Sequence, residues 1–139
     1  MRRPSVLSVL GVPPADMFDV KVVMETSVIL EDADVTNIVA KAFETGGAGD
    51  FARLDTDPDA VKAAGALMAD GEIVLSSIDE PENKWTLSMK DLAYGIKKYV
   101  EDGYDYKEVF MPTGNHVDRL TSLDAGYIVQ LALFHGIYY

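Results

Sequence analysis

The chain has 139 residues and a formal net charge of -11, because 23 acidic residues outnumber 12 basic ones. It contains no cysteine, which excludes disulfide bonds and thiolate metal sites and permits a cytoplasmic location. A chain this acidic is repelled by nucleic-acid backbones and anionic membranes, so we expect no direct contact with either, whereas a basic protein surface attracts it.

This length is typical of one domain. We predict an N-terminal arm over residues 1–16 and a single domain over residues 17–139. Two arginines precede an apolar run near the start, as in a secretory signal. That run, Val6 to Val12, is short and is interrupted by Ser8 and Gly11, so we expect a loose or docked arm rather than an export signal.

The segment from Met17 to Leu30 is rich in β-branched residues and predicts two short strands or one bent strand. Apolar residues then recur at helical spacing at Val35, Ile38, Val39, Ala42 and Phe43. We predict a helix here, with Asp32 or Asp34 as its N-cap and Gly46 at its end.

A glycine-rich run, Gly46-Gly47-Ala48-Gly49, follows this helix. Phosphate groups bind at helix N-termini, whereas this run lies after a helix and does not match the phosphate-loop pattern. We therefore predict a sharp turn that ends the helix. The alternative is that the glycines let a ligand or a second chain approach the backbone.

The acidic run from Asp55 to Asp59 resembles the start of a calcium-binding loop. It lacks the glycine and the glutamate that such a loop needs at its sixth and twelfth positions. We interpret it as a helix start, with Asp57 as the N-cap and Pro58 as the first helical residue, followed by a helix over 59–69.

A β-hairpin is predicted next, with strands at 72–78 and 84–87 joined by a polar turn. A helix over 88–102 follows, because its apolar residues keep helical spacing. Ser88 and Asp91 have the spacing of a capping box at its start.

The segment from Tyr104 to Leu120 has no sustained period, and we predict a long loop with one short strand around Val109 and Phe110. Long loops in compact domains are uncommon and often functional. His116 and Arg119, within this loop, are among the few side chains that are suited to act on a ligand.

The stretch from Leu123 to Tyr139 leaves almost no polar face, which predicts a buried helix that is too short to span a bilayer. We expect Ser122 or Asp124 to cap its start and His135 to act as a cation at its C-terminal end. The tail from Ile137 to Tyr139 is expected to pack into the domain or against another copy of it.

Together these elements predict an α+β fold. We expect a small antiparallel sheet, built from the strands near 18–30, 72–78 and 84–87, packed against three or four helices. The C-terminal helix should be buried in its core.

No catalytic constellation is visible in the sequence. The two histidines lack the spacing of a zinc site, and no nucleophile elbow is present, so we expect no enzyme, no metal and no cofactor. Aromatic residues, which favour interfaces, are the better indication of binding. The candidate binding residues are Gly46, Gly47, Phe51, Arg53, Tyr104, Tyr106, Phe110, His116 and Arg119.

Three motifs carry a resemblance: Val35-x-x-Ile38-Val39-x-x-Ala42-Phe43-Glu44-x-Gly46-Gly47, then Lys84-Trp85-Thr86-Leu87 leading into Leu92-x-x-Gly95-Ile96, and then Asp124-x-x-x-Ile128-Val129-Gln130-x-Ala132-Leu133-Phe134-x-x-x-Tyr138. Over residues 28 to 139 the chain resembles a family of small acidic proteins encoded in bacteriophages and prophages of gut bacteria. Thr45, which separates Glu44 from the glycines, and the run from His135 to Ile137 depart from the family pattern. The resemblance implies a phage or mobile-element origin and a protein that acts on the host, but it implies no particular activity.

The main hypothesis is a non-enzymatic inhibitor that binds a host defence component, such as a nucleic-acid-guided nuclease, in the cytoplasm of the host bacterium. Its acidic surface would face the basic, nucleic-acid-binding surface of that partner, as in an anti-CRISPR-like or other counter-defence protein. One alternative is an oligomeric binder of a small molecule or signalling nucleotide, built from the Gly46–Gly49 turn, the aromatics and Arg53 or Arg119. Another is a structural or assembly protein of a phage, with the C-terminal tail as a contact between copies in a homo-oligomer.

Overall fold

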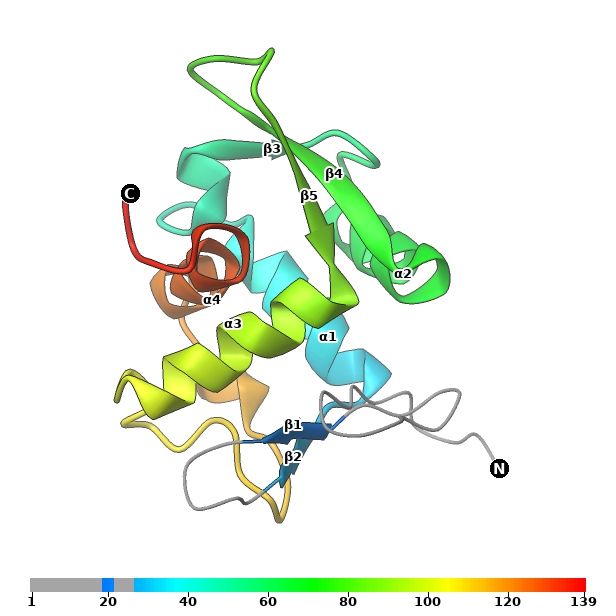
Figure 1. Cartoon of the computed structure of the whole chain (residues 1–139). Helices are drawn as coiled ribbons and strands as arrows, with labels where there is room; N and C mark the ends of the chain where they lie inside the picture. Colours follow the sequence, from blue (N-terminus) through cyan, green and yellow to red (C-terminus); the bar gives the residue numbers. More distant parts are fainter. Residues whose placement is uncertain (1–18, 22–26) are drawn as a thin grey trace.

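The structure of the protein is a computed structural model that describes residues 19–21 and 27–139 (Figure 1). The predicted N-terminal arm, residues 1–16, and residues 17–18 and 22–26 lie outside the described residues. The described part contains four α-helices and two small antiparallel sheets, which confirms the predicted α+β class.

The α-helices lie close to the predicted ranges: α1 is Asp32–Ala42, α2 is Ala60–Asp70, α3 is Met89–Glu101 and α4 is Ser122–Phe134. Two short 3-10 helices are η2, Ala48–Asp50, and η3, Val117–Arg119. Helix α4 packs against both α1 and α3, and Figure 1 shows it nearly end-on beside α3. Its buried side chains include Ala125, Ile128, Val129, Leu131 and Ala132, so the prediction of a buried C-terminal helix is confirmed.

The larger sheet has three antiparallel strands in the order β3-β4-β5, with β3 at Ala52–Leu54, β4 at Glu72–Ser77 and β5 at Lys84–Ser88. Strands β4 and β5 form the predicted hairpin, whose tip projects from the rest of the molecule (Figure 1). A separate sheet pairs β1, Asp19–Lys21, with β2, Ser27–Ile29.

The prediction that the strands near 18–30 join the main sheet is wrong. Strand β3 occupies that edge of β4 instead, with Leu54 opposite Leu75 and Ala52 opposite Ser77. Three residues are too few to show a clear alternation of apolar and polar side chains, so the sequence does not reveal β3. The two-stranded sheet lies beside α3.

Local hydrogen bonds place three helix starts differently from the prediction. The N-cap of α1 is Glu31, whose backbone N–H donates to Asp34 at 3.0 Å. The N-cap of α2 is Asp59 rather than Asp57, because the Asp57 carboxylate accepts from the Asp59 N–H in a turn of its own. The N-cap of α4 is Thr121, whose hydroxyl accepts from the Asp124 N–H at 3.1 Å.

The start of α3 is as predicted. The Asp91 N–H donates to the Ser88 hydroxyl at 3.0 Å, and the Ser88 N–H donates to the Asp91 carboxylate at 3.0 Å. This reciprocal pair satisfies two of the backbone donors that a helix start leaves open. At its middle, α3 approaches α4 closely, since a Cβ added at Gly95 would lie 2.5 Å from the Ile128 carbonyl oxygen.

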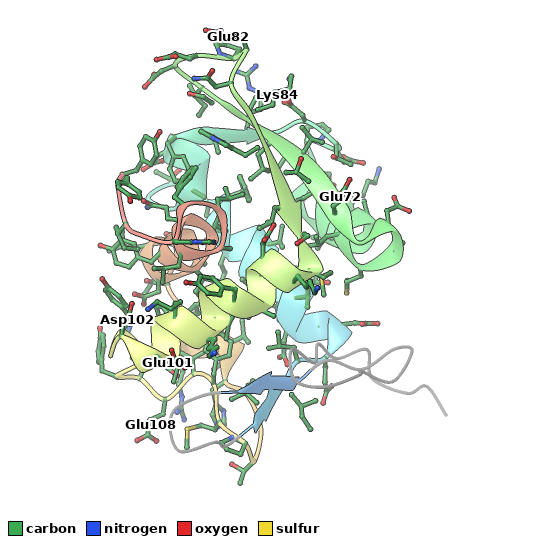
Figure 2. The ribbon with its side chains drawn as sticks, in the orientation of Figure 1. Glu72, Glu82, Lys84, Glu101, Asp102 and Glu108 are labelled. Atoms are coloured by element: carbon green, nitrogen blue, oxygen red, sulfur yellow. The ribbon has the colours of Figure 1, made fainter. Side chains whose placement is uncertain are left out.

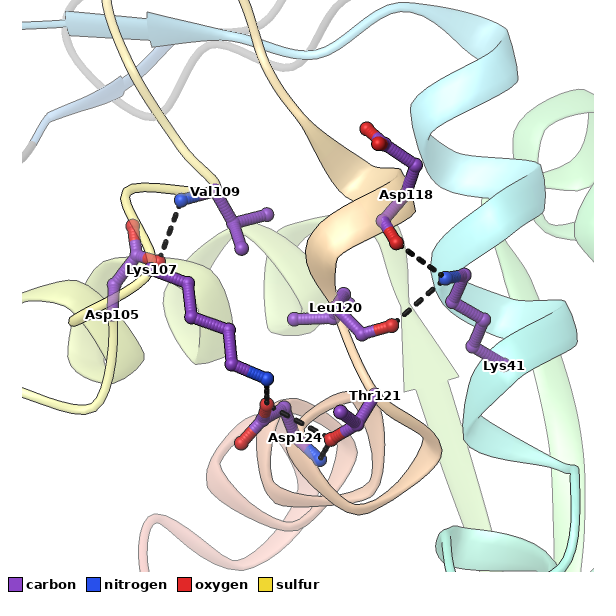
Figure 3. Close-up of polar contacts among 8 residues, drawn as sticks. All are labelled: Lys41, Asp105, Lys107, Val109, Asp118, Leu120, Thr121 and Asp124. Carbon is purple, nitrogen blue, oxygen red and sulfur yellow. Dashed lines mark hydrogen bonds and ion pairs between the residues drawn. The ribbon is translucent and has the colours of Figure 1, made fainter.

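The segment 104–120 is the predicted long loop, but the short strand expected at Val109 and Phe110 is absent from it. Instead the Asp105 carboxylate accepts from the Val109 N–H at 2.8 Å and the Phe110 N–H at 3.0 Å. Lys41 on α1 donates to the carbonyl oxygens of Leu120 at 2.8 Å and Asp118 at 3.3 Å (Figure 3). Side chains therefore supply several of the partners that a strand would have given to this backbone, and the His116 N–H donates to the Val109 carbonyl oxygen at 2.7 Å.

Candidate binding surfaces

The glycine-rich run forms a sharp turn, as predicted, but it does not end the helix at Gly46. Helix α1 ends at Ala42 with Phe43 as its C-cap, and Gly46 lies three residues further on with φ of 91°. A Cβ added at Gly47 would lie 2.4 Å from the Ala42 carbonyl oxygen and 2.6 Å from the Ser122 carbonyl oxygen. Gly47 therefore lets the start of α4 approach the end of α1. The backbone that lies against Gly47 is thus that of the same chain, where the alternative prediction placed a ligand or a second chain.

A cavity of about 320 Å³, which we call the glycine pocket, opens beside this turn. Its lining consists of Gly46, Gly47, Asp50, Phe51, Leu123, Gly126, Gln130 and Tyr139. One carboxylate oxygen of Asp50 accepts from the Gly46 N–H at 3.1 Å, which fixes this exposed side chain at the pocket. The pocket thus joins the turn after α1 to α4 and to the end of the chain.

Gln130 is a polar residue within the apolar part of α4 that follows its first turn, and its side chain holds the C-terminal tail. It is only 3% exposed. Its Oε1 accepts from the Tyr138 N–H at 2.7 Å and from the Tyr139 N–H at 2.8 Å. These two bonds satisfy a buried acceptor and orient the last two residues back along α4.

The tail brings aromatic rings together beside the glycine pocket. The ring of Tyr139 stacks on that of Phe51, with centroids 4.3 Å apart and planes 7° apart. The Phe134 ring lies edge-on to Trp85 at 5.1 Å and to Tyr138 at 6.2 Å. We call these five residues the aromatic patch.

The patch is only partly covered, since Tyr138 is 73% exposed and Tyr139 is 61% exposed. Its outer side has a shallow hollow of about 490 Å³ lined by Trp85, Phe134, Tyr138 and Tyr139. The tail thus packs into the domain, which is the first of the two alternatives predicted for residues 137–139. Aromatic rings with a buried body and a free edge are enriched where proteins bind partners.

His135 lies at the C-terminal end of α4, where it was expected, and takes the left-handed conformation with φ of 59°. Its ring contacts that of Tyr94, with centroids 4.6 Å apart. The cation role of His135 stays a prediction.

Acidic residues gather in one segment, residues 44–82, which we call the acidic segment. It contains ten acidic residues against two basic ones, a net charge of -8 within the total of -11. The acidic residues are Glu44, Asp50, Asp55, Asp57, Asp59, Asp70, Glu72, Asp79, Glu80 and Glu82. All except the half-buried Asp57 are exposed.

This segment forms η2, β3, α2, β4 and the tip of the hairpin, which lie toward one side of the molecule (Figure 1). Figure 2 shows Glu72 and Glu82 on this side, whereas Glu101, Asp102 and Glu108 lie at the other end of the molecule. The acidic charge is therefore unevenly distributed over the fold.

One carboxylate of the acidic segment, that of Asp55, is held by a basic residue. Lys84 approaches it at 2.7 Å, and the Ser76 hydroxyl donates to it at 2.8 Å. The hydrogen bond from Lys84, and next that from Ser76, lower the pKa of the Asp55 carboxyl. None of the other nine carboxylates has a basic partner within 4.0 Å in the described part of the chain.

The loop 104–120 packs over a buried phenol, and its residues 111–115 line a separate hollow of about 470 Å³ together with Ile29, Glu31 and Asp34. Tyr99 on α3 is 1% exposed, and burial raises the pKa of its phenol, with the nearby carboxylates of Asp124 and Asp105 adding to the shift. Lys107 lies 3.9 Å from the Asp124 carboxylate, as Figure 3 shows. This arrangement closes the loop onto the start of α4.

The structure brings together only part of the predicted binding set. Gly46, Gly47 and Phe51 line the glycine pocket, and Arg53 is exposed on β3 within the acidic segment. The five candidates from the 104–120 loop do not line that pocket: Tyr104, Tyr106, Phe110, His116 and Arg119.

Those five differ among themselves. Phe110 is buried edge-on against Tyr99, with centroids 6.1 Å apart, so it belongs to the core. Arg119 donates to the Lys107 carbonyl oxygen at 3.3 Å, whereas His116 is exposed and Tyr106 is 75% exposed.

Sequence reasoning missed the residues that come to the pocket from the other end of the chain, namely Leu123, Gly126, Gln130 and Tyr139, together with Asp50. The lone glutamine in an apolar helix is the signal that points to one of them, because a buried amide requires hydrogen-bond partners.

Among residues 19–21 and 27–139, no cluster of three or more histidine, aspartate or glutamate side chains is arranged to hold a metal ion. In the same part of the chain, no helix has both the length and the apolar character needed to cross a membrane. Comparison of the chain with protein-family models, with curated proteins and with solved structures finds no match.

Proposed function

We propose that the protein is a non-enzymatic binding protein whose acidic segment covers a basic, nucleic-acid-binding face of a partner protein. The observation that carries this proposal is the net charge of -8 on residues 44–82, with nine of the ten carboxylates exposed. Lysine and arginine side chains that hold phosphate groups also pair with carboxylates, so such a surface competes for the same cations.

The resemblance to phage proteins suggests which kind of cell and partner the protein acts on. The partner is then a defence component of the host bacterium, such as a nucleic-acid-guided nuclease, and the protein is a counter-defence inhibitor in the host cytoplasm. By covering the partner's basic face, the inhibitor prevents the nuclease from binding its nucleic acid.

Charge of this kind acts mainly through the association rate. Exposed ion pairs each contribute only about 0.2–1 kcal/mol, so no single carboxylate dominates the affinity. A field from many uncompensated carboxylates raises the association rate by roughly 10- to 1,000-fold, and salt screens it. Tight binding therefore needs a second, less charged contact, and the aromatic patch beside Asp50 is suited to that role.

A panel of purified nucleic-acid-guided nucleases tests the proposal. The protein is expected to bind at least one of them, to block its loading with nucleic acid, and to be displaced by excess nucleic acid. Raising the ionic strength from about 0.1 M to about 1 M shortens the Debye length from about 10 Å to about 3 Å and should slow association steeply. Binding that does not change with salt contradicts the charge-based mechanism, and no binding across the panel contradicts this class of partner.

The nucleotide-binding hypothesis gains less support. Phosphate groups require cations or a helix N-terminus, whereas the charged side chain in the lining of the glycine pocket is the carboxylate of Asp50. Arg53 and Arg119, which that hypothesis assigned to the site, do not belong to the lining.

A further inference from the structure

We infer that the glycine pocket receives an arginine side chain of the protein partner. This inference rests on the proposed function, because it takes a basic protein surface as the occupant and names the contact that anchors it. The pocket lies where the acidic segment meets the aromatic patch, so a cation attracted by the first arrives beside the second.

The first supporting feature is the carboxylate of Asp50. Its Oδ1 accepts from the Gly46 N–H at 3.1 Å, which holds the side chain at the pocket, and its Oδ2 has no partner among the described residues. A carboxylate that is already positioned loses little side-chain freedom when a cation binds it. Charge-assisted hydrogen bonds to such a group are stronger than neutral ones.

The second feature is the stacked pair of Phe51 and Tyr139. One face of the Tyr139 ring lies on Phe51, and the residue is 61% exposed, so a large part of the ring is open to a partner. Gln130 holds the backbone of Tyr139, which keeps the ring in place. A guanidinium group is planar and stacks on aromatic faces, whereas an ammonium group is compact and strongly hydrated.

The third feature is the size and backbone of the pocket. Its volume of about 320 Å³ is at the small end of ligand sites, which run from roughly 300 to 1,000 Å³. Gly46, Gly47 and Gly126 contribute no side chains to its lining, so the side chains around the pocket come from the other five lining residues. Its side chains include one carboxylate and no cation, which favours a guanidinium over a phosphate or a carboxylate.

A titration followed by NMR tests the inference on the full chain. The probe is a tripeptide with a central arginine, blocked at both ends, and the controls replace arginine with citrulline or lysine. We expect saturable shifts at the backbone amides of Gly46 and Gly47 and at the side-chain amide of Gln130. Citrulline has a similar shape without the charge and should not bind, and lysine should bind at least about fivefold more weakly.

Two pairs of variants separate the pocket from general charge. Asp50→Asn keeps an acceptor for Gly46 but removes the charge, and it should weaken arginine binding by about tenfold or more. Asp79→Asn removes the same charge at the hairpin tip and should weaken binding less than about twofold. Tyr139→Ala should weaken it clearly, whereas Tyr138→Ala, a ring outside the pocket lining, should not.

The inference is overturned if the shifts spread over the acidic segment, if lysine binds as well as arginine, or if Asp50→Asn and Asp79→Asn have equal effects. It is also overturned if the arginine probe causes no shifts at the pocket at millimolar concentration. These results do not depend on the nuclease panel. Loss of the arginine site with retained, salt-dependent nuclease binding leaves the proposed function standing, and the reverse result leaves the pocket standing without it.

Discussion

Replacing Gly47 with alanine tests how tightly the turn after α1 packs against α4. The added Cβ would lie 2.4 Å from the Ala42 carbonyl oxygen and 2.6 Å from the Ser122 carbonyl oxygen. Both atoms belong to the backbone, so relief requires that the end of α1 and the start of α4 separate. Overpacking of this kind typically costs about 1–3 kcal/mol, and two backbone contacts place Gly47→Ala at the upper end of that range.

Gly65→Ala is the matched control, because a Cβ at Gly65 meets nothing within 4 Å and the position is exposed on α2. Alanine has the higher helix propensity, so this variant should be more stable by about 0.5–1 kcal/mol. Urea unfolding followed by the fluorescence of Trp85, the single tryptophan, measures both free energies. A Gly47→Ala variant as stable as the unmodified protein would refute the close packing of the turn on α4.

Three further predictions concern the tail and the buried phenol. Gln130→Leu removes the acceptor of the Tyr138 and Tyr139 N–H groups, so these two amides should lose protection from hydrogen exchange while the amides of α4 keep theirs. Unchanged protection at Tyr138 and Tyr139 would refute the role of Gln130 in holding the tail. Burial raises the pKa of the Tyr99 phenol above its ordinary value of 10.0, so its stabilising contribution is complete below about pH 10 and is lost as pH rises further. Tyr99→Phe should therefore lessen the alkaline loss of unfolding free energy by up to about 1.4 kcal/mol per pH unit, and an equal slope in both proteins would contradict this. If the exposed tail joins copies of the chain, deletion of 137–139 should convert an oligomer into a monomer, and an unchanged mass by light scattering rules out that contact.

Elements with local signals could be predicted from the sequence. Helix α3 has its capping box and its apolar spacing within one stretch, and the structure reproduces both. Strand β3 could not be predicted, because three residues carry no clear period and its pairing with β4 depends on a segment more than twenty residues away. The N-caps failed for a related reason, since several neighbouring polar residues compete for the same position, as Asp57 and Asp59 do at the start of α2.

The candidate binding surface divides in the same way. Gly46, Gly47 and Phe51 are close in sequence and could be named together, and they do line one pocket. Tyr139 and Gln130 reach that pocket only because α4 returns along the turn after α1, which no local pattern encodes. Phe110 was predicted to bind a partner because it is aromatic, but its side chain is buried in the core. The sequence does not show whether an aromatic ring is buried or exposed.

The central claim is that the acidic segment is the contact surface, and two charge-matched variants test it. The first neutralises three exposed carboxylates of that segment: Glu72→Gln, Asp79→Asn and Glu82→Gln. The second neutralises three exposed carboxylates outside it: Glu101→Gln, Glu108→Gln and Asp118→Asn. Both change the net charge from -11 to -8, so the same overall charge is removed from two different parts of the fold.

The most direct measurement is the association rate of each variant with a nuclease that the unmodified protein inhibits, taken at low ionic strength. We expect the first variant to associate about tenfold more slowly and the second to stay within about twofold of the unmodified protein, because the local field steers association. Equal rates for the two variants would contradict the claim that residues 44–82 form the contact surface.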